Sequence, residues 1–237
     1  MGEDADRLVH SPEDVRGSPA TEREYPGAGR WVPHGCSLDE LRRVARGCRG
    51  CPLYRNATQT VFSTGPATAR IVLVGEQPGD QEDRRGAPFV GPAGNLLDRA
   101  LEEVGIDRAE AYVTNAVKHF KFRQDGPGKR RIHQTPDQRE INACRPWLTA
   151  ELAILDPEVV VALGATAGKA LVGPDFRVTR SRGALLPWSS VSGEEARRAS
   201  AFFLATVHPS AVLRADDREA AYRGLVEDLR LAAEVLT

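Results

Sequence analysis

The chain has 237 residues, of which 41% are hydrophobic, and this is enough to form one sizeable core. Its formal net charge of -1 excludes a general attraction for nucleic acid, so any DNA binding needs a local basic patch. No apolar run approaches the ~18 residues of a membrane span and no signal-peptide core is present, so we expect a cytoplasmic protein without membrane contact. Four cysteines, two of them as Cys48-x-x-Cys51, indicate a metal or cluster site rather than a disulfide framework.

Two polar stretches mark the boundaries of the folded part. Residues 1–35 are rich in Gly, Pro and charge and have no helical or strand period, so we expect a flexible N-terminal extension without a catalytic role. Residues 36–237 should form a single catalytic domain. The stretch from Ser189 to Ser200 lies between two apolar runs and is expected to be a surface insertion between strands.

The remaining chain alternates between predicted helices and strands. Ser37 and Glu40 form a capping box that opens a short helix leading to the cysteine pair. A second box, from Thr135 to Gln138, opens a long helix that Pro146 should kink or interrupt. Continuous β-branched runs predict buried parallel strands. The predicted strands are 71–74, 111–117, 158–163 and 202–207, and the other helices are 94–104, 165–171 and 218–235.

This alternation predicts an α/β fold, with three layers (α/β/α) around a central, mainly parallel four-stranded sheet. Ligands of such folds bind at the carboxyl ends of the strands. Polar side chains follow several of the predicted strands directly. They are Glu76 and Gln77 in the Gly75–Asp80 turn, Asn115, and the His208-Pro209-Ser210 turn.

Each of these strand-end residues also has an ordinary structural interpretation. The Gly75–Asp80 turn is equally consistent with a solvated acidic turn, and Asn115 with a turn or cap residue. His208 is held on a stiff turn by Pro209, although a lone histidine is more often structural. Phe89 is either a stacking platform for a base or a core aromatic residue, and composition does not decide between them.

The segment from Lys118 to His133 is the local basic patch. It carries six lysines and arginines against one acidic residue, Asp125, and ends in Lys129-Arg130-Arg131-Ile132-His133. Alone, such a loop is usually a solvated basic loop. Its charge suits contacts with DNA phosphates.

Taken together, these motifs resemble the uracil-DNA glycosylase superfamily. The Gly75–Asp83 segment looks like its first motif and His208-Pro209-Ser210 like its last, while the Cys48-x-x-Cys51 pair looks like the iron–sulfur family 4 branch. The insert at 129–133 is similar to one group only, the UdgX group, which traps DNA covalently. The resemblance covers roughly Leu41 to Val235 and implies a DNA-repair enzyme for base excision.

The resemblance also implies a [4Fe–4S] cluster. Where family 4 carries its third cysteine, this chain has His119, so the implied ligands are Cys48, Cys51, His119 and Cys144. Cys36 is the competing fourth ligand, because it would complete an all-cysteine set. A zinc site with three cysteines and one histidine is the other alternative.

The mechanism implied by the resemblance begins with base recognition. Uracil would stack on Phe89 while Asn115 reads its edge, and His208 would stabilise the departing uracil anion. Gly75 and Ser210 belong to the same substrate-binding set.

His133 would then attack C1′ of the sugar and remain bonded to DNA. Glu76 would position or activate His133, and Gln77 and Asp80 would shape the sugar side. Arg131 would hold the loop, and with Lys129 and Arg130 would meet phosphates.

The expected partner is uracil-containing DNA, with single strands preferred although the sequence leaves this open, and the expected state is a monomer with one turnover. Two alternatives remain. One is a uracil-DNA glycosylase that uses water and turns over; the other is a non-catalytic iron–sulfur module that binds DNA.

Overall fold

The computed structural model describes residues 24–192 and 201–237 of the chain. Its described residues form a six-stranded sheet in the order β1-β3-β2-β6-β8-β7, whose four inner strands are parallel. The outer strands β1 and β7 are antiparallel to their neighbours. The predicted α/β fold with a mainly parallel sheet is confirmed, and two short edge strands extend the four predicted ones. The strands are β1 Ser63–Thr64, β2 Ile71–Gly75, β3 Tyr112–Asn115, β6 Val159–Leu163, β7 Leu185–Pro187 and β8 Phe202–Thr206.

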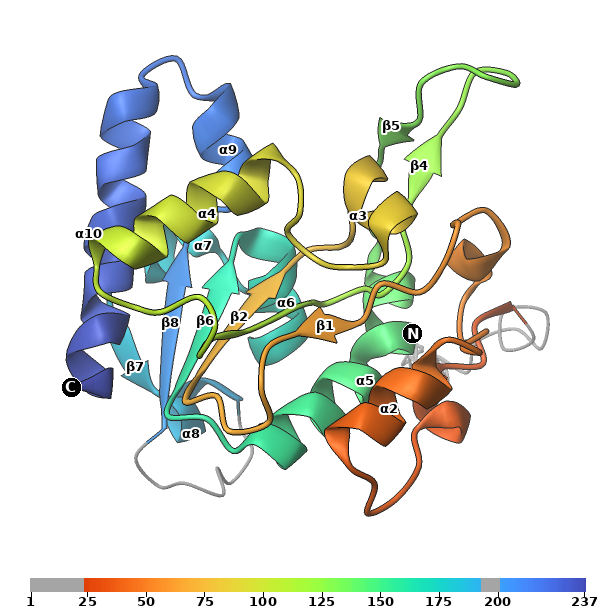
Figure 1. Ribbon diagram of the computed structural model, residues 1–237, viewed down its shortest axis with the longest axis horizontal. Coiled ribbons are helices and arrows are strands. Elements are labelled where there is room, and N and C mark those ends of the chain that lie inside the picture. The colour runs from red at the N-terminus through yellow and green to blue at the C-terminus, as the bar shows by residue number, and fades with distance from the viewer. Residues whose placement is uncertain (1–23, 193–200) are drawn as a thin grey trace, which may run out of the picture.

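Helices cover both faces of this sheet, as Figure 1 shows. One hydrophobic cluster joins one face of the sheet to α2, α5 and α6, and a second joins the other face to α4 and α10. Every residue of β2 and β6 is buried, because each of these central strands packs against helices on both sides. The helices are η1 Ala28–Trp31, α2 Leu38–Ala45, η2 Pro52–Arg55, α3 Asp80–Arg85, α4 Pro92–Glu103, α5 Gln138–Leu155, α6 Ala165–Val172, α7 Val178–Ser181, α8 Trp188–Ser192, α9 Pro209–Arg214 and α10 Arg218–Leu236.

The long helix α5 begins later than its sequence suggests. Its N-cap is Asp137, whose side chain accepts hydrogen bonds from the amides of Arg139 (2.9 Å) and Glu140 (3.1 Å). The predicted cap at Thr135 is therefore wrong, since the Asp137–Glu140 box satisfies the free amides of the first turn. Pro146 lies inside α5 without interrupting it.

Part of the expected N-terminal extension lies on the domain. Its residues 1–23 fall outside the described part of the chain, but η1 packs against α5 and its Ala28 is fully buried. The polar stretch expected to be a surface insertion also falls largely outside it, at 193–200. Within the described residues, no helix is long and apolar enough to cross a membrane.

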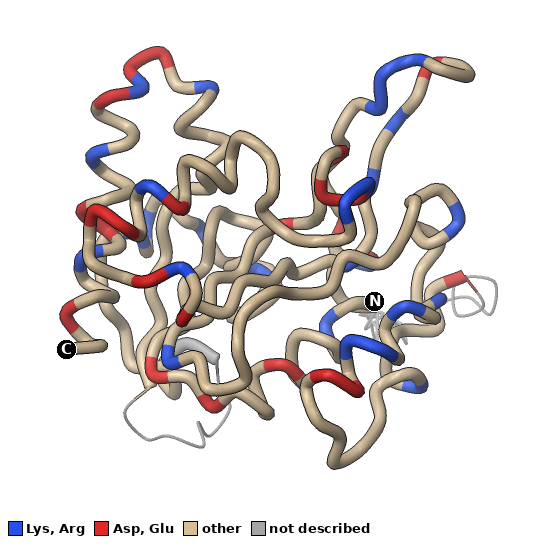
Figure 2. The backbone as a smooth tube through the Cα atoms, viewed as in Figure 1, with Lys and Arg blue, Asp and Glu red and all other residues tan. Residues whose placement is uncertain are grey.

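A separate two-stranded hairpin stands at one end of the molecule. Its strands are β4 Phe122–Arg123 and β5 Ile132–His133, which are antiparallel, and Phe122 pairs with His133. In Figure 1 the hairpin extends from the end of the sheet at which α3 and α9 lie, and Figure 2 shows basic residues along it. The basic pentapeptide of the sequence thus forms the returning arm of this hairpin.

One member of the predicted basic patch is in the core. Lys118 has no exposed surface, and its ammonium group donates to Glu151, to the hydroxyl of Thr114 (2.6 Å) and to the carbonyl of Asn115 (2.9 Å). Glu151 is equally buried and also accepts from the hydroxyl of Tyr112 (2.8 Å). Lys118 is therefore unable to contact phosphate, and the prediction that placed it in a phosphate-binding patch is wrong.

The buried pair gives a stability prediction. Lys118→Met leaves the Glu151 carboxylate buried without its cation, so we expect the free energy of unfolding to fall by about 3–5 kcal/mol. The double variant Lys118→Met/Glu151→Leu should recover most of this loss. Urea unfolding followed by tryptophan fluorescence measures both. Lys129→Met, at the exposed hairpin tip, is the control, and a loss in Lys118→Met no larger than in this control would contradict the prediction.

Candidate active site

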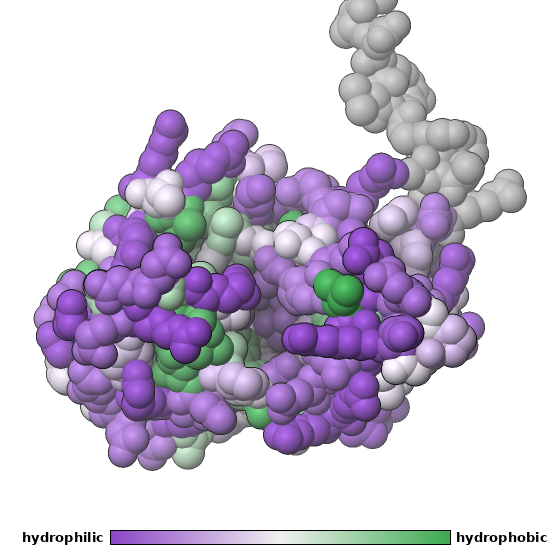
Figure 3. Space-filling model, turned by 90° about the horizontal axis from the view of Figure 1, so that it is seen from above, coloured by the Kyte–Doolittle hydropathy of each residue, from purple (hydrophilic) through white to green (hydrophobic). Residues whose placement is uncertain are grey.

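Residues from the carboxyl ends of three parallel strands line one pocket of about 460 Å³. The hairpin and the amino end of α9 complete its walls, and Figure 3, which looks down on this end of the molecule, shows a hollow between two raised sides. Seven of the twelve catalytic and substrate-binding residues predicted from the sequence lie here. The pocket is lined by Glu76, Gln77, Gly79, Glu82, Phe89, Ala93, Asn115, His133, Thr135, His208, Ser210 and Arg214.

The floor of the pocket is formed by Phe89 against Gly75. A Cβ atom at Gly75 would lie 2.6 Å from the Phe89 ring and 2.3 Å from Oδ1 of Asn115, so only glycine leaves both side chains in place. Phe89 has a φ of 56°, a left-handed conformation that costs energy for a bulky residue and often occurs at functional sites. Gly94 permits this loop to approach α4, since a Cβ there would lie 1.7 Å from the Phe89 carbonyl oxygen.

The Asn115 side chain carries an unsatisfied acceptor. Asn115 is 1% exposed, and its Oδ1 has no hydrogen-bond partner among the described residues. A buried polar atom without a partner costs about 1–3 kcal/mol, and such atoms in native proteins usually have a functional explanation. Because Asn115 lines the pocket, a ligand with an N–H group would supply the missing donor.

His208 is held as a neutral hydrogen-bond donor. Its Nδ1 accepts from the backbone amide of Ser210 (3.1 Å) and lies 2.8 Å from the Ser210 hydroxyl oxygen. Because Nδ1 accepts from the amide, the ring proton belongs on Nε2. Burial in the pocket wall lowers the pKa of His208 to about 4, which keeps the imidazole uncharged at neutral pH. A neutral Nε2–H can donate to an oxygen that gains negative charge.

Glu76 lies between His133 and Thr166. Its Oε1 is 2.8 Å from Nε2 of His133, and its Oε2 accepts from the hydroxyl of Thr166. Burial raises the pKa of Glu76, but the hydrogen bonds from His133 and Thr166 outweigh it and hold the pKa below its ordinary value. An ionised carboxylate only accepts, so the ring nitrogen of His133 that faces it carries the proton. When the ring carries this one proton, its other nitrogen keeps a lone pair.

Gln77 ties both arms of the hairpin to the strand-end turn. Its Oε1 accepts from the amide of Lys121 (2.8 Å), and its Nε2 donates to the carbonyls of Lys121 (3.1 Å) and Gln134 (3.0 Å). Both amide protons of Gln77 are used in this way. Its 3.3 Å approach to Nδ1 of His133 is therefore a packing contact, and that nitrogen is not occupied by Gln77.

Arg131 fixes the hairpin to α3 through two ion pairs. Its guanidinium pairs with Asp80 and with the fully buried Asp83 (2.6 Å), and lies 5.3 and 5.0 Å from the ring centroids of Phe120 and Phe122. The Arg131 side chain is 10% exposed. These contacts place Arg131 in the role of holding the loop. Asp80 pairs with Arg131 and Arg84 and does not line the pocket, so it does not touch the space expected for the sugar.

Two of the other basic side chains in the segment 118–133 are held in ion pairs. Lys121 pairs with Glu140 (2.7 Å) and Arg123 with Asp125 (3.1 Å). Lys129 and Arg130 lie exposed in the hairpin loop, without an acidic partner among the described residues. They do not line the pocket, so they can meet only a ligand that extends beyond it.

The cysteine pair and Cys144 lie together in the core beside α5. Trp147 donates its indole N–H to the sulfur of Cys48 (3.2 Å), and the Lys118 amide donates to the sulfur of Cys144 (3.3 Å). Burial, together with the nearby Cys48 and the carboxylates of Glu140 and Asp137, raises the pKa of Cys51 to about 11. Burial also raises the pKa of Cys144, so the thiols of Cys51 and Cys144 stay protonated unless a metal replaces the proton.

His119 is oriented so that one ring nitrogen is available. The Thr60 hydroxyl donates to the carbonyl of Ala45 (3.1 Å), so it accepts from Nε2 of His119 (3.0 Å), and Nδ1 is left with its lone pair. Burial lowers the pKa of His119 to about 4, so the ring is neutral, as a metal ligand requires. No three described acidic, histidine or cysteine side chains converge closely enough to hold a single metal ion. Cys36 is partly buried against the same core cluster.

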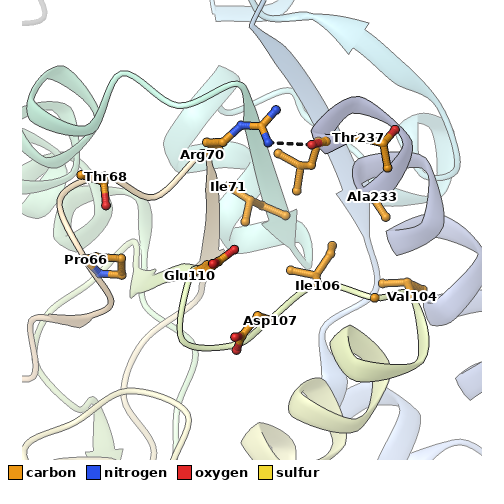
Figure 4. Close-up of a pocket in the computed structure, with 12 residues that line it drawn as sticks. Pro66, Thr68, Arg70, Ile71, Val104, Ile106, Asp107, Glu110, Ala233 and Thr237 are labelled. Atoms are coloured by element: carbon orange, nitrogen blue, oxygen red, sulfur yellow. Dashed lines mark hydrogen bonds between the residues drawn. The ribbon is translucent and has the colours of Figure 1, made fainter.

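A second pocket, of about 420 Å³, lies at the opposite end of the sheet (Figure 4). Its principal charged group, Arg70, is occupied, because it pairs with Glu158 (2.7 Å) and donates to the carbonyl of Leu236 (2.6 Å). None of the predicted site residues lies there. The candidate active site is therefore the pocket at the carboxyl ends of the strands.

Comparison with known proteins agrees with this geometry. The family model of the uracil-DNA glycosylase superfamily matches residues 62–230. The chain belongs to this superfamily. A Type-4 uracil-DNA glycosylase of Thermotoga maritima is 39% identical over 186 residues, which cover 78% of this chain and 87% of that protein. Proteins of the same name from Sulfurisphaera tokodaii (33% identity; 75% and 76% of the two chains) and Pyrobaculum aerophilum (37%; 57% and 64%) are also similar.

Two site residues of this superfamily member escaped the sequence analysis. Thr166 follows β6 in the first turn of α6, and a polar residue just past a strand end was the available signal. In the sequence Asp83 looks like an ordinary acidic residue of a short polar helix. Its ion pair with Arg131 becomes visible only in the folded structure.

The buried neutral state of His208 predicts a pH dependence of stability in this superfamily member. An unfolded histidine binds its proton near pH 6.5, whereas folded His208 binds it only near 4. Stability that His208 contributes is therefore complete above pH 6.5 and is lost as the pH falls toward 4. We expect this to amount to about 1–3 kcal/mol, reduced from the full value because the ring borders an open pocket.

Thermal unfolding of the wild type and of His208→Gln between pH 4 and 8 measures this contribution. The wild-type melting temperature should fall more steeply with acid, while His119 contributes equally to both proteins. Parallel curves would contradict the prediction.

Proposed function

We propose that the protein is a uracil-DNA glycosylase of the UdgX type, which removes uracil from DNA and bonds His133 to the resulting sugar. The observation that carries the proposal is the contact between His133 and Glu76 at the mouth of the pocket. The relatives named Type-4 uracil-DNA glycosylase support the reaction class. The covalent step rests on the hairpin, whose geometry presents an imidazole beside the pocket.

Recognition of uracil uses three side chains that are already in place. The base stacks on Phe89, and its ring N–H donates to the unsatisfied Oδ1 of Asn115. The neutral His208 donates from Nε2 to the uracil oxygen that becomes negative as the glycosidic bond breaks. Because a stacked base must leave its duplex at a cost of about a few kcal/mol, a single strand should be the better substrate.

The covalent step follows departure of the uracil anion, which leaves positive charge at C1′ of the sugar. The ring nitrogen of His133 that holds a lone pair attacks C1′ and forms a C–N bond. The proton on the other ring nitrogen passes to Glu76, and the uracil anion takes a proton from solvent. Since His133 is anchored beside the site, its effective concentration of about 10⁵–10⁸ M exceeds that of competing water. Lys129 and Arg130 would meet phosphates of the flanking strand.

The test of this proposal is a denaturing gel. Mixed with single-stranded DNA that contains one uracil, the wild type should give a DNA adduct that survives SDS and heat. His133→Ser should lose the adduct, and uracil release through water should remain or increase. His34→Ser, at an exposed histidine, is the matched control and should crosslink fully.

Three outcomes would contradict parts of the proposal. An undiminished adduct in His133→Ser would show that another nucleophile is used. Several uracils released per wild-type molecule, without an adduct, would favour the alternative glycosylase that uses water. Binding without any uracil release would favour the non-catalytic DNA-binding module.

We further propose that Cys48, Cys51, His119 and Cys144 hold a [4Fe–4S] cluster. The N–H groups that donate to the sulfurs and the free Nδ1 of His119 support this set. Separate donors suit a cluster, in which each ligand binds a different iron, better than a single zinc ion. When bound, the cluster would cross-link the cysteine loop, the end of β3 and α5.

Metal analysis of the purified protein tests the cluster. We expect about four irons and four sulfides per chain, with little zinc, and the loss of most iron in Cys144→Ser. His119→Cys should retain iron because thiolate is the commoner ligand, whereas Cys36→Ser should not change the iron content. Iron loss in Cys36→Ser with full retention in His119→Ala would transfer the fourth position to Cys36.

A further inference from the structure

The Glu76 carboxylate has two oxygens, and the fold gives each a different partner. Oε1 faces His133 from the hairpin, and Oε2 accepts a hydrogen bond from Thr166 of α6. We propose that Thr166 is the positioning residue of this pair: its hydroxyl holds Glu76 in the orientation that presents Oε1 to His133. This inference rests on the proposed function of His133.

The position of Thr166 is fixed by the start of α6. Thr166 is 7% exposed and lies in the first turn of α6, two residues after the N-cap Gly164, whose φ is 92°. The Gly164 amide donates to the carbonyl of Thr206 (2.9 Å), so the start of the helix is tied to the neighbouring strand. Thr166 therefore approaches Glu76 from a fixed element, whereas His133 approaches it from a hairpin.

The hydrogen bond also has a definite direction. A threonine hydroxyl has one proton, and an ionised carboxylate can only accept. The amino end of α6 adds partial positive charge on the same side of the carboxylate. The titratable groups that face Glu76 are His133 and His208. Without Thr166, the side chain of Glu76, which is 23% exposed, would be free to turn away from His133.

This position predicts which step Thr166 affects. Departure of uracil depends on Phe89, Asn115 and His208, and Thr166 contacts none of them in the hydrogen bonds of the described residues. Capture of the sugar requires Glu76 to accept the ring N–H proton of His133 as the C–N bond forms. Loss of the Thr166 hydroxyl should therefore slow formation of the adduct while uracil release continues.

Thr166→Val removes the hydroxyl at nearly constant shape. In single-turnover reactions with uracil-containing single-stranded DNA, we expect adduct formation to slow about 10-fold, as for loss of a hydrogen bond to a charged group. The acid limb of its pH profile should move to higher pH, because Glu76 loses a contact that favours its ionised form. Uracil release, measured in the same samples, should change less than the adduct.

Three comparisons separate positioning from packing. Thr166→Ser keeps the hydroxyl and should restore the wild-type rate and pH profile. In a Glu76→Gln background, Thr166→Val should have little further effect, because the two residues act through one contact. Thr64→Val, which removes a hydroxyl that accepts from Arg108 (3.0 Å) on the edge strand, should trap DNA as the wild type does.

Each result bears on a different claim. If the wild type forms no adduct, the proposed function of His133 is wrong and this inference falls with it. If the wild type forms the adduct and Thr166→Val matches its rate and pH profile, this inference alone is overturned. Equal impairment of the valine and serine variants, or full additivity with Glu76→Gln, would assign Thr166 to packing only.

Discussion

The ion pair between Arg131 and the fully buried Asp83 is the contact on which the site depends. A buried carboxylate is costly without a cation, and a buried guanidinium without an anion, so each requires the other. Asp83 also accepts from the amide of Thr58 (3.0 Å), so the pair joins α3, the loop after η2 and the hairpin. His133 lies two residues beyond Arg131. The pair therefore helps to set the position of His133 relative to Glu76, although neither Arg131 nor Asp83 lines the pocket.

The pocket divides its tasks between two kinds of structure. Phe89, Asn115 and His208 follow or flank central strands of a fully packed sheet, which suits recognition of a rigid ring. His133 belongs to a hairpin that Gln77 and Arg131 fasten to the rest of the domain. Glu76 lies at the boundary and contacts both parts. Under the proposed mechanism the base-binding half is complete without the hairpin, and the hairpin would add a nucleophile to it.

Much of this architecture is encoded locally in the sequence. The runs at β2 and β6 are short, apolar and rich in β-branched residues, which is typical of strands covered on both faces, and the carboxyl ends of parallel strands meet at one edge. Burial of Lys118 is not encoded in this way, because its partner Glu151 is 33 residues away. Thr135 and Asp137 both precede a glutamine or glutamate by three residues, so pattern alone does not choose the cap. Edge strands of two or three residues carry no periodicity, and their pairing depends on the finished sheet.

The hairpin is fastened at its base, while its tip makes few contacts. Gly126 and Gly128 have positive φ angles of 117° and 73° and no crowding around them, so the turn between the arms is unconstrained by neighbours. The turn could therefore be lengthened without moving His133 relative to Glu76. A short peptide label inserted between Gly126 and Gly128 would protrude into solvent, giving a handle on the protein beside its DNA-facing surface.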